Sequence, residues 1–406
     1  MYANSKESCS FLKRSPNLPY SMFTNCRPPQ SVRHLFGLNE HFNIISMLKK
    51  CFLNHSAYSP LPQPVVDVMK KYNEDLCHFD IDESEYSLGQ EVFARLVGAE
   101  KDEIALVQNT STGLNIVANI LDCPKGSNVV TTDLEYPSVV YPWLKTKLGV
   151  ELRYVKNANG SILVEDVEQA VDDQTVAIAI SHVAYVNGFR HDLKALAEIA
   201  HEHGAYLVVD AIQSLGAIPV DVRKDDVDFL TASCYKWLLG PAGAGYLYVR
   251  KELVERFEPP FIGWASVEPE VFETIEFWDI WRLQLSNTAS RFEIGSPSFI
   301  SFVGAAAAIQ LLLDVGIDNI QKRILILTKL LMDLVKRLGL SLTTPEDSEQ
   351  RSGIVHFLID RALERAKKLR KQGIIVSARS NGLRIAPHFY NTEDEIERLI
   401  QELEAT

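Results

Sequence analysis

The most regular feature of the chain is a series of short apolar runs that alternate with amphipathic stretches. Two of the runs, residues 177–181 and 206–210, are apolar at nearly every position, which is typical of strands covered on both faces. Strands are predicted at residues 104–108, 128–132, 152–155, 175–181, 206–210, 228–232 and 245–249. Helices are predicted between them at residues 113–121, 138–148, 165–171 and 192–203. This alternation predicts an α/β fold, with a mostly parallel, seven-stranded sheet between helices.

The segments on either side of this pattern complete the large domain and form a second one. Helices at 63–73 and 89–97 precede the first strand, and residues 304–338 have a strongly helical composition that is interrupted at Gly316. The tail predicts a small α+β layer, with strands at 353–359, 374–379 and 383–387 and helices at 361–372 and 392–404. We therefore divide the chain into an N-terminal extension (1–45), a large domain (46–305) and a small C-terminal domain (306–406). Residues 46–62, at the start of the large domain, can also pack on the small domain.

The first 45 residues differ from the rest of the chain in composition. Before Glu40 there is a single acid, Glu7, against the basic residues Lys6, Lys13, Arg14, Arg27 and Arg33. A basic, acid-poor N-terminus is the pattern of an organelle transit peptide. The amphipathic helix that such a peptide needs is interrupted by Pro16, Pro19, Pro28 and Pro29. We therefore expect a disordered extension, with organelle targeting as the alternative.

The net charge of −12 narrows the classes of function, because nucleic-acid binders usually carry a basic face. The chain contains no run of about 20 apolar residues, so no membrane span is predicted. The six cysteines are scattered, without a CxxC pair or a zinc-like spacing, and no apolar signal-peptide core precedes the first domain. The composition therefore favours a cytoplasmic protein with free thiols that binds neither nucleic acid nor membranes.

Polar side chains follow two of the predicted strands at the point where each strand ends. Asp210 ends the run YLVVD and Gln213 follows it, while Ser233 and Lys236 follow the run at 228–232. Ligands of open α/β sheets bind at the carboxyl ends of strands. A carboxylate can keep a pyridine nitrogen protonated, and a lysine in an apolar setting such as SCYKWLLGP can form a Schiff base. These residues indicate a pyridoxal phosphate site with Asp210 and Lys236 as its catalytic residues. The alternatives are a structural cap or ion pair for Asp210 and a surface position for Lys236.

The sequence QNTSTG, residues 108–113, joins a predicted strand to a helix. The hydroxyls of Thr110 and Ser111, together with the free N–H groups of the helix N-terminus, suit a phosphate. An ordinary helix cap explains the same residues. The glycine-rich residues 240–245 precede a strand rather than a helix, so they predict a bend. His201 and His203 face different ways on a helix, so no metal site is predicted.

Residues 206–249 resemble the class V aminotransferase family, the fold-type I pyridoxal phosphate enzymes that include cysteine desulfurases and isopenicillin N epimerase-like proteins. The family pattern is Asp-x-x-Gln at one strand end and Ser-x-His/Tyr-Lys later in the chain. The matching residues are Asp210, Gln213, Ser233, Tyr235 and Lys236. The resemblance covers roughly residues 54–404. It implies the fold-type I architecture, with a mixed seven-stranded sheet in the large domain and a small α+β domain, and it implies a homodimer.

Further cofactor-binding residues carry over from the resemblance one at a time. Thr110 and Ser111 match the hydroxyls that bind the cofactor phosphate. Tyr136, in DLEYPS, matches an aromatic residue or His that stacks on the pyridine ring. Tyr185 falls where the family has a residue that contacts the ring hydroxyl, often Asn in desulfurases, and Gln213 would contact the same oxygen.

The last three matches concern the phosphate, the neighbouring subunit and the substrate. Ser233 would bind the phosphate, and Ser296, in FEIGSPSF, matches a residue that reaches the cofactor of the other subunit. Arg384, in GLRIAPHFYNT, matches the arginine that holds the substrate carboxylate through two parallel hydrogen bonds. The alternative for Arg384 is a structural ion pair with a nearby acid.

The resemblance implies that Lys236 forms an internal aldimine and later removes the α-proton of the substrate. Transamination of a small amino acid is the expected reaction. Epimerisation, C–S lyase or cysteine desulfurase-like chemistry and a non-catalytic role are the alternatives. Desulfurases carry a nucleophilic cysteine in the C-terminal domain, whereas no cysteine follows Cys234 here. The persulfide route is therefore disfavoured.

Overall fold

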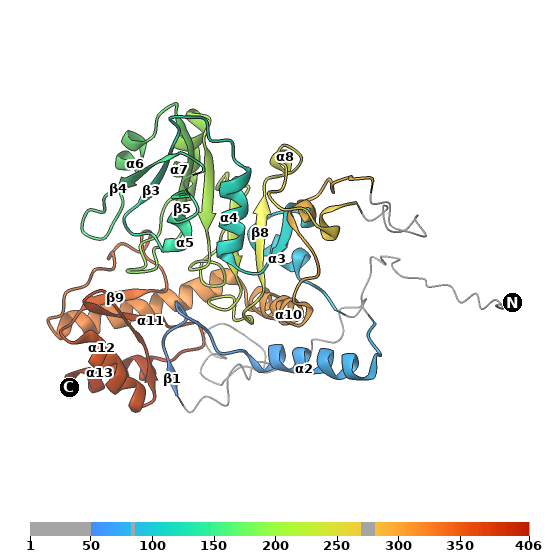
Figure 1. Cartoon of the computed structure of the whole chain (residues 1–406). Coiled ribbons are helices and arrows are strands. Elements are labelled where there is room, and N and C mark those ends of the chain that lie inside the picture. The colour runs from blue at the N-terminus through green and yellow to red at the C-terminus, as the bar shows by residue number, and fades with distance from the viewer. Residues whose placement is uncertain (1–49, 83–85, 146, 269–280, 406) are drawn as a thin grey trace.

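The computed structural model of the chain describes residues 50–82, 86–145, 147–268 and 281–405 (Figure 1). The extension predicted for residues 1–45 lies outside these residues. A large sheet with helices on both faces lies above a smaller layer that contains the C-terminus in the view of Figure 1.

The large sheet has seven strands in the order β2-β8-β7-β6-β5-β3-β4. Strand β8 runs antiparallel to both of its neighbours, and the other neighbouring pairs are parallel. The mostly parallel, mixed seven-stranded sheet predicted from the sequence is therefore confirmed. The strands are β2 (Ile104–Val107), β3 (Asn128–Thr132), β4 (Glu151–Val155), β5 (Thr175–Ser181), β6 (Tyr206–Asp210), β7 (Phe229–Ser233) and β8 (Gly245–Val249).

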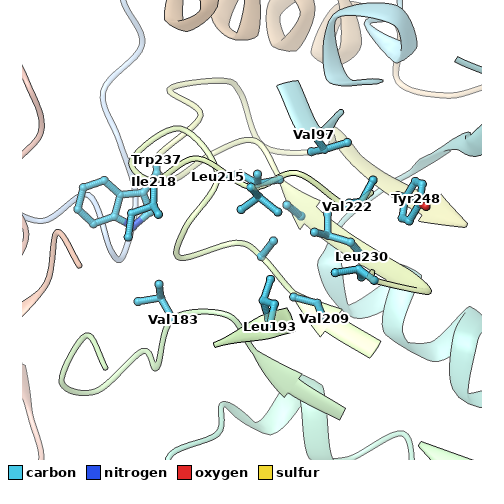
Figure 2. Close-up of a cluster of buried hydrophobic side chains, with 14 of the residues drawn as sticks. Val97, Val183, Leu193, Val209, Leu215, Ile218, Val222, Leu230, Trp237 and Tyr248 are labelled. Carbon is cyan, nitrogen blue, oxygen red and sulfur yellow. The ribbon is translucent and has the colours of Figure 1, made fainter. Parts of the chain in front are cut away.

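Each face of this sheet is covered by its own set of helices. Along β6, Leu207 and Val209 belong to the buried cluster on one face, and Val208 belongs to the cluster on the other. The first face packs against α3 (Gln90–Val97), α6 (Val164–Ala170), α7 (Leu193–Glu202) and α10 (Phe299–Val315). The second face packs against α4 (Thr110–Ile120), α5 (Pro137–Val140) and α8 (Lys251–Val254). Figure 2 shows part of the first cluster, with Trp237 at one end and Tyr248 at the other.

The smaller layer has a separate buried core. Helix α11 (Ile317–Arg337) joins the two layers, because Ile324 packs in the first cluster of the large sheet and Leu327 packs in the core of the small layer. The boundary predicted after residue 305 falls inside α10, whose buried residues pack with the large sheet. The small layer contains β9 (Val355–Leu358), α12 (Ala362–Lys371), β10 (Ile374–Ile375), β11 (Ser377–Arg379), β12 (Gly382–Ile385) and α13 (Glu393–Glu404).

The N-terminal part of the described chain crosses between the two layers. Strand β1 (Cys51–Phe52) pairs in parallel with β10 of the small layer, and α2 (Gln63–His78) packs against α10 of the large one. The segment between them therefore lies where the two layers meet. The remaining short helices are the 3₁₀ turns Lys101–Glu103, Trp264–Ser266 and Ala289–Phe292.

Two sequence predictions about elements are wrong. The helix predicted at 138–148 is only the four-residue α5, because Pro142 has no N–H to donate and its ring clashes with the carbonyl four residues earlier. The single strand predicted at 374–379 is divided, since β10 pairs with β1 and β11 pairs with β12.

Within the described residues, no single helix is both long enough and apolar enough to span a membrane, whereas α10 and α11, bent by 79° at their junction, meet that criterion as a pair by length and composition.

Candidate active site

One cavity of about 640 Å³ brings together nearly all the residues predicted for the site. It lies beyond the ends of β6 and β7, at the position where α/β sheets bind ligands, and its volume is typical of small-molecule sites. The predicted residues that line it are Thr110, Ser111, Tyr136, Tyr185, Asp210, Gln213, Ser233, Tyr235, Lys236 and Arg384. Ser296 is exposed and does not line the cavity of its own chain.

Lys236 lies in the turn that follows β7. Its Nζ is 5.8 Å from the centre of the Tyr136 ring and 5.9 Å from that of the Tyr235 ring. Burial lowers the pKa of Lys236 to about 8, and the guanidinium groups of Arg384 and Arg379 act in the same direction, whereas the Asp210 carboxylate opposes them. Near neutral pH an appreciable fraction of Lys236 is therefore a neutral amine, which is the form that acts as a nucleophile or a base.

Asp210 ends β6 and is buried beside a second acid. The backbone N–H of Ile212 donates to its Oδ1 at 2.9 Å, and burial raises the pKa of Asp210 to about 6. Glu135 accepts hydrogen bonds from the backbone N–H and the hydroxyl of Ser181, at 2.8 and 2.5 Å. Burial raises the pKa of Glu135 to about 7 and the nearby Asp210 raises it further, although the bonds from Ser181 oppose this. The charge of Asp210 therefore disfavours the ionisation of Glu135, whereas the ammonium of Lys236 lowers the pKa of Asp210 and so stabilises its charged form.

A group of hydroxyls surrounds the N-terminus of α4. Ser233 and Thr110 are fixed to each other by three contacts: from the Thr110 N–H to Ser233 Oγ at 2.7 Å, between the two side-chain oxygens at 2.9 Å, and from the Ser233 N–H to Thr110 Oγ1 at 2.9 Å. Ser111 Oγ lies 2.7 Å from Ser138 Oγ. Asn109 caps the helix by accepting the N–H of Thr112 at 2.9 Å. The hydroxyls and the positive end of the helix dipole together suit a phosphate.

The turn that carries Lys236 is held from three directions. The indole N–H of Trp237 donates to Gln213 at 3.0 Å, and the amide of Gln213 donates to the backbone carbonyl of Ser56 at 3.0 Å. The N–H of Ser59 donates to the Tyr235 carbonyl at 2.9 Å. A Cβ on Gly216 would lie 2.2 Å from the Trp237 carbonyl oxygen, so only glycine permits this approach. The segment before α2 thus helps to fix the lysine, although it is far away in sequence.

Arg384 on β12 is only 1% exposed and lines the cavity. Its Nη1 donates to the carbonyl of Tyr185 at 2.6 Å, and its Nε donates to Ser377 Oγ at 3.3 Å. Burial, together with the charge of Arg379, lowers the pKa of Arg384 to about 9, so the group remains a cation at neutral pH. Across the described part of the chain no carboxylate pairs with Arg384, so the predicted alternative of a structural ion pair finds no partner there. A buried cation that is hydrogen-bonded only to neutral groups favours an anionic ligand.

The structure also adds residues that the sequence did not indicate. The sequence positions of two of them are informative. Ser138 lies two residues after Tyr136, in α5, and Arg379 lies two residues after Ser377, which is opposite Arg384 in the hairpin. The added lining residues are Ser56, Ala57, Ser138, Ile212 and Arg379.

Comparison with known proteins gives the family. The family model described as aminotransferase class-V matches residues 51–399. The chain belongs to the class V aminotransferase family. It is 34% identical over 384 residues to "Uncharacterized aminotransferase YcbU" of Bacillus subtilis, which covers 93% of this chain and 98% of that protein. It is 31% identical to a "Probable cysteine desulfurase" of Pyrococcus abyssi over 382 residues, 87% of this chain and 93% of that one.

The fold agrees with this assignment. The apo structure of a cysteine desulfurase from Thermococcus onnurineus superposes with a TM-score of 0.82 at 28% identity, covering 94% of this chain and 98% of that one. The class V family consists of pyridoxal phosphate enzymes of fold type I, and pyridoxal phosphate is the cofactor of this chain.

The cavity of this class V enzyme fits that cofactor. The three hydroxyls of Thr110, Ser111 and Ser233 at the start of α4 suit a phosphate, and the buried acid Asp210 suits a pyridine nitrogen. Lys236, with its lowered pKa, matches the aldehyde carbon. The phosphate, the ring nitrogen and the aldehyde carbon of the cofactor therefore each have a chemical counterpart among the lining residues.

In the described chain, no cysteine lines this cavity and no cluster of side chains there is placed to hold a metal ion. None of the four described cysteines, Cys51, Cys77, Cys123 and Cys234, lines it. Cys234 is buried and its pKa is raised by that burial. Among the described residues, no group of three or more His, Cys, Asp or Glu is placed to hold a metal ion.

Proposed function

We propose that this class V enzyme is a pyridoxal phosphate-dependent aminotransferase that acts on a small amino acid. The observation that carries the proposal is the convergence of Lys236, Asp210 and Arg384 on one cavity of about 640 Å³. A base, an acid that holds a ring nitrogen and a cation for a carboxylate are the groups that amino-acid chemistry on this cofactor requires.

The roles follow from the environment of each residue. When bound, pyridoxal phosphate supplies an electron sink for the bonds at the substrate α-carbon. Asp210 would hold the pyridine nitrogen in its protonated form, and Thr110 and Ser233 would hold the phosphate. Lys236 would hold the cofactor covalently until the amine of the substrate displaces it. The freed Nζ would then accept the α-proton and return it, since its pKa of about 8 lies close to neutral pH.

Arg384 would orient the substrate. Its Nη1 and Nε are already fixed by Tyr185 and Ser377, so the guanidinium is held in one position before a ligand arrives. A fixed planar guanidinium can bind a carboxylate with little further loss of conformational entropy. The α-carbon of the bound amino acid would then lie within reach of Lys236.

Two further properties belong to this proposal. We propose a homodimer in which Ser296 reaches the cavity of the partner subunit, since it lies outside the cavity of its own chain. We also propose a cytoplasmic location, as the composition favours.

A cysteine desulfurase-like activity is the second candidate, because the relative from Pyrococcus abyssi is named a probable cysteine desulfurase. Persulfide transfer requires a thiolate at the substrate. Within the described chain the thiols of Cys51 and Cys234 are buried, their pKa values are raised by burial, and neither lines the cavity. This supports transamination over persulfide transfer.

Product identification tests the proposal. The holoenzyme is incubated with single amino acids and a panel of 2-oxo acids, and the products are identified by mass spectrometry. Transamination predicts equal amounts of the oxo acid from the donor and the amino acid from the acceptor, and Lys236→Ala should form neither. Release of ammonia or sulfide without an acceptor, or inversion of the α-carbon alone, would contradict transamination in favour of elimination or epimerisation.

A further inference from the structure

A second arginine, Arg379, lines the same cavity and has no role in the proposed reaction. It ends β11, and its Nη1 donates to the carbonyl of Ala378 at 2.8 Å. Within the part of the chain that the structure describes, no acid forms an ion pair with it. Its carbonyl accepts a contact from His356 Nε2 at 2.9 Å, which fixes the backbone at this position.

The hairpin register places Arg379 and Arg384 on one face of the small sheet. Arg384 on β12 is opposite Ser377 on β11, and Arg379 is two residues beyond Ser377. Side chains alternate along a strand and opposite residues share a face, so the two arginines are diagonal neighbours. The residue opposite Arg379 is Gly382, and the imidazole of His356 packs where a side chain at Gly382 would lie.

These two cations repel each other and Lys236. The charge of Arg379 lowers the pKa of both Arg384 and Lys236, after the larger effect of burial on each. Like charges on neighbouring positions of a sheet destabilise it unless an anion lies between them. The arrangement is therefore unfavourable for the empty protein and favourable for a ligand with more than one negative charge.

The charged side chains that line the cavity can be assigned one at a time to groups of the cofactor and the substrate. The charged lining residues are one acid, Asp210, and three bases, Lys236, Arg379 and Arg384. In the proposed function Asp210 pairs with the cofactor nitrogen, Lys236 bonds to the cofactor and Arg384 binds the substrate α-carboxylate. The hydroxyls and the N-terminus of α4 hold the cofactor phosphate in the same proposal. Arg379 is therefore the one charged lining residue among those described to which no group of the cofactor or the substrate is assigned.

We propose that Arg379 binds a second anionic group at the end of the substrate side chain, so that the substrate class is an amino acid with an acidic side chain. This inference rests on the proposed function for the assignment of Arg384. Arg384 is almost fully buried and suits the α-carboxylate deep in the cavity, whereas Arg379 is partly exposed and suits the outer end of a longer substrate. A guanidinium binds a carboxylate through paired hydrogen bonds, so the selectivity for charge should be large.

A pair of ligands that differ only in one charge tests this without turnover. Glutarate and its monoamide, glutaramate, are titrated into the holoenzyme by calorimetry. We expect glutarate to bind at least about tenfold more tightly, and Arg379→Gln to reduce that preference to about twofold or less. Arg379→Lys should restore part of the preference. Arg337→Gln removes an exposed charge outside the cavity lining and should leave the preference unchanged. Equal affinities in the native protein, or a preference that survives in Arg379→Gln, would overturn the proposal.

A parallel activity measurement separates this inference from the proposed function. The ratio of kcat/KM for glutamate to that for glutamine is measured with the native enzyme and Arg379→Gln. A fall in this ratio, with the value for glutamine unchanged, supports the role of Arg379. Turnover of neutral amino acids with no preference for glutarate would leave the aminotransferase standing and refute the acidic substrate class. A strong, Arg379-dependent preference for glutarate in a protein that transfers no amino group would refute the aminotransferase and keep the anion site.

Discussion

Lys236 occupies a position where burial and charge act on its pKa in opposite directions. Removal from water and the two arginines favour the neutral amine, while Asp210 favours the ammonium form, and the result is a pKa of about 8. A lysine that titrates near neutral pH can both bond to an aldehyde and carry protons. The chemistry that we assign to this residue thus follows from its surroundings rather than from the lysine itself.

The first prediction concerns this pKa in the apoprotein. Competitive acetylation over a range of pH, read by peptide mass spectrometry, should give a midpoint near pH 8 for Lys236. Lys224, whose pKa is raised above its ordinary value by Asp221, provides the opposite reference in the same sample. Because the Asp210 carboxylate raises the pKa of Lys236, Asp210→Asn should move the midpoint to lower pH. A midpoint of Lys236 at or above that of Lys224 would contradict the account.

Near the site, α4 and β7 pack closely against each other. A Cβ on Gly113 would lie 2.3 Å from Thr231 Oγ1, and that hydroxyl is buried and donates to the Tyr246 carbonyl at 3.0 Å. Glycine therefore lets the helix approach the strand closely. This approach places the N-terminus of α4 and its Thr110 beside Ser233.

Gly113→Ala should accordingly disturb both stability and the phosphate site. The clash should lower the free energy of unfolding by about 1–3 kcal/mol, partly offset by the better helix propensity of alanine, and should weaken binding of pyridoxal phosphate. Thermal unfolding and a cofactor titration measure the two effects. Asn115→Ala, on the exposed side of the same helix, should change neither appreciably. A Gly113→Ala protein with native stability would show that the contact is not tight.

The sequence located the elements better than their connections. The bounds of all seven strands of the large sheet agree with the prediction within one residue. Most of these strands are buried along nearly their whole length, whereas β4, at the edge of the sheet, is largely exposed or half-buried. The helix predicted at 138–148 is wrong because its amphipathic spacing continues past Pro142, where the helix has already ended. The split between β10 and β11 depends on which strands they pair with, and a single sequence does not contain that information.

The same limit applies to the site. Asp210, Ser233 and Lys236 follow strands whose ends meet in the sheet, so their proximity could be inferred. Ser56 reaches Gln213 across 157 positions of the chain, and no local pattern indicates such a contact. Arg379 was missed because its relation to Arg384 depends on the hairpin register.

For the whole molecule, an apolar surface lies beside the cavity. A hollow of about 340 Å³ next to the start of α4 is lined in part by Phe261 and Ile294, which are 62% and 44% exposed. Ser296 lies two residues after Ile294 in the chain. Exposed apolar surface of this kind is typical of protein interfaces, which agrees with the proposed homodimer.

The dimer should be needed for a complete site. Sedimentation at the concentrations used for assays should give a mass twice that of the chain. Ser296→Ala should weaken cofactor binding by several-fold if its hydroxyl bonds across the interface, although it lies outside the cavity of its own chain. Ser290→Ala serves as the control, because its hydroxyl contacts only Ser286 and Thr288 among the described residues. A fully active monomer would contradict both the dimer and the role of Ser296.

If Lys236 forms a Schiff base with pyridoxal phosphate, the cofactor can be attached to this residue irreversibly by reduction. The holoenzyme is reduced with borohydride, digested and mapped by mass spectrometry, with Lys236→Ala treated in parallel. We expect a pyridoxyl group on Lys236 alone in the native protein and no labelled peptide in the variant. A label on another lysine, or no label in a protein saturated with pyridoxal phosphate, would contradict it.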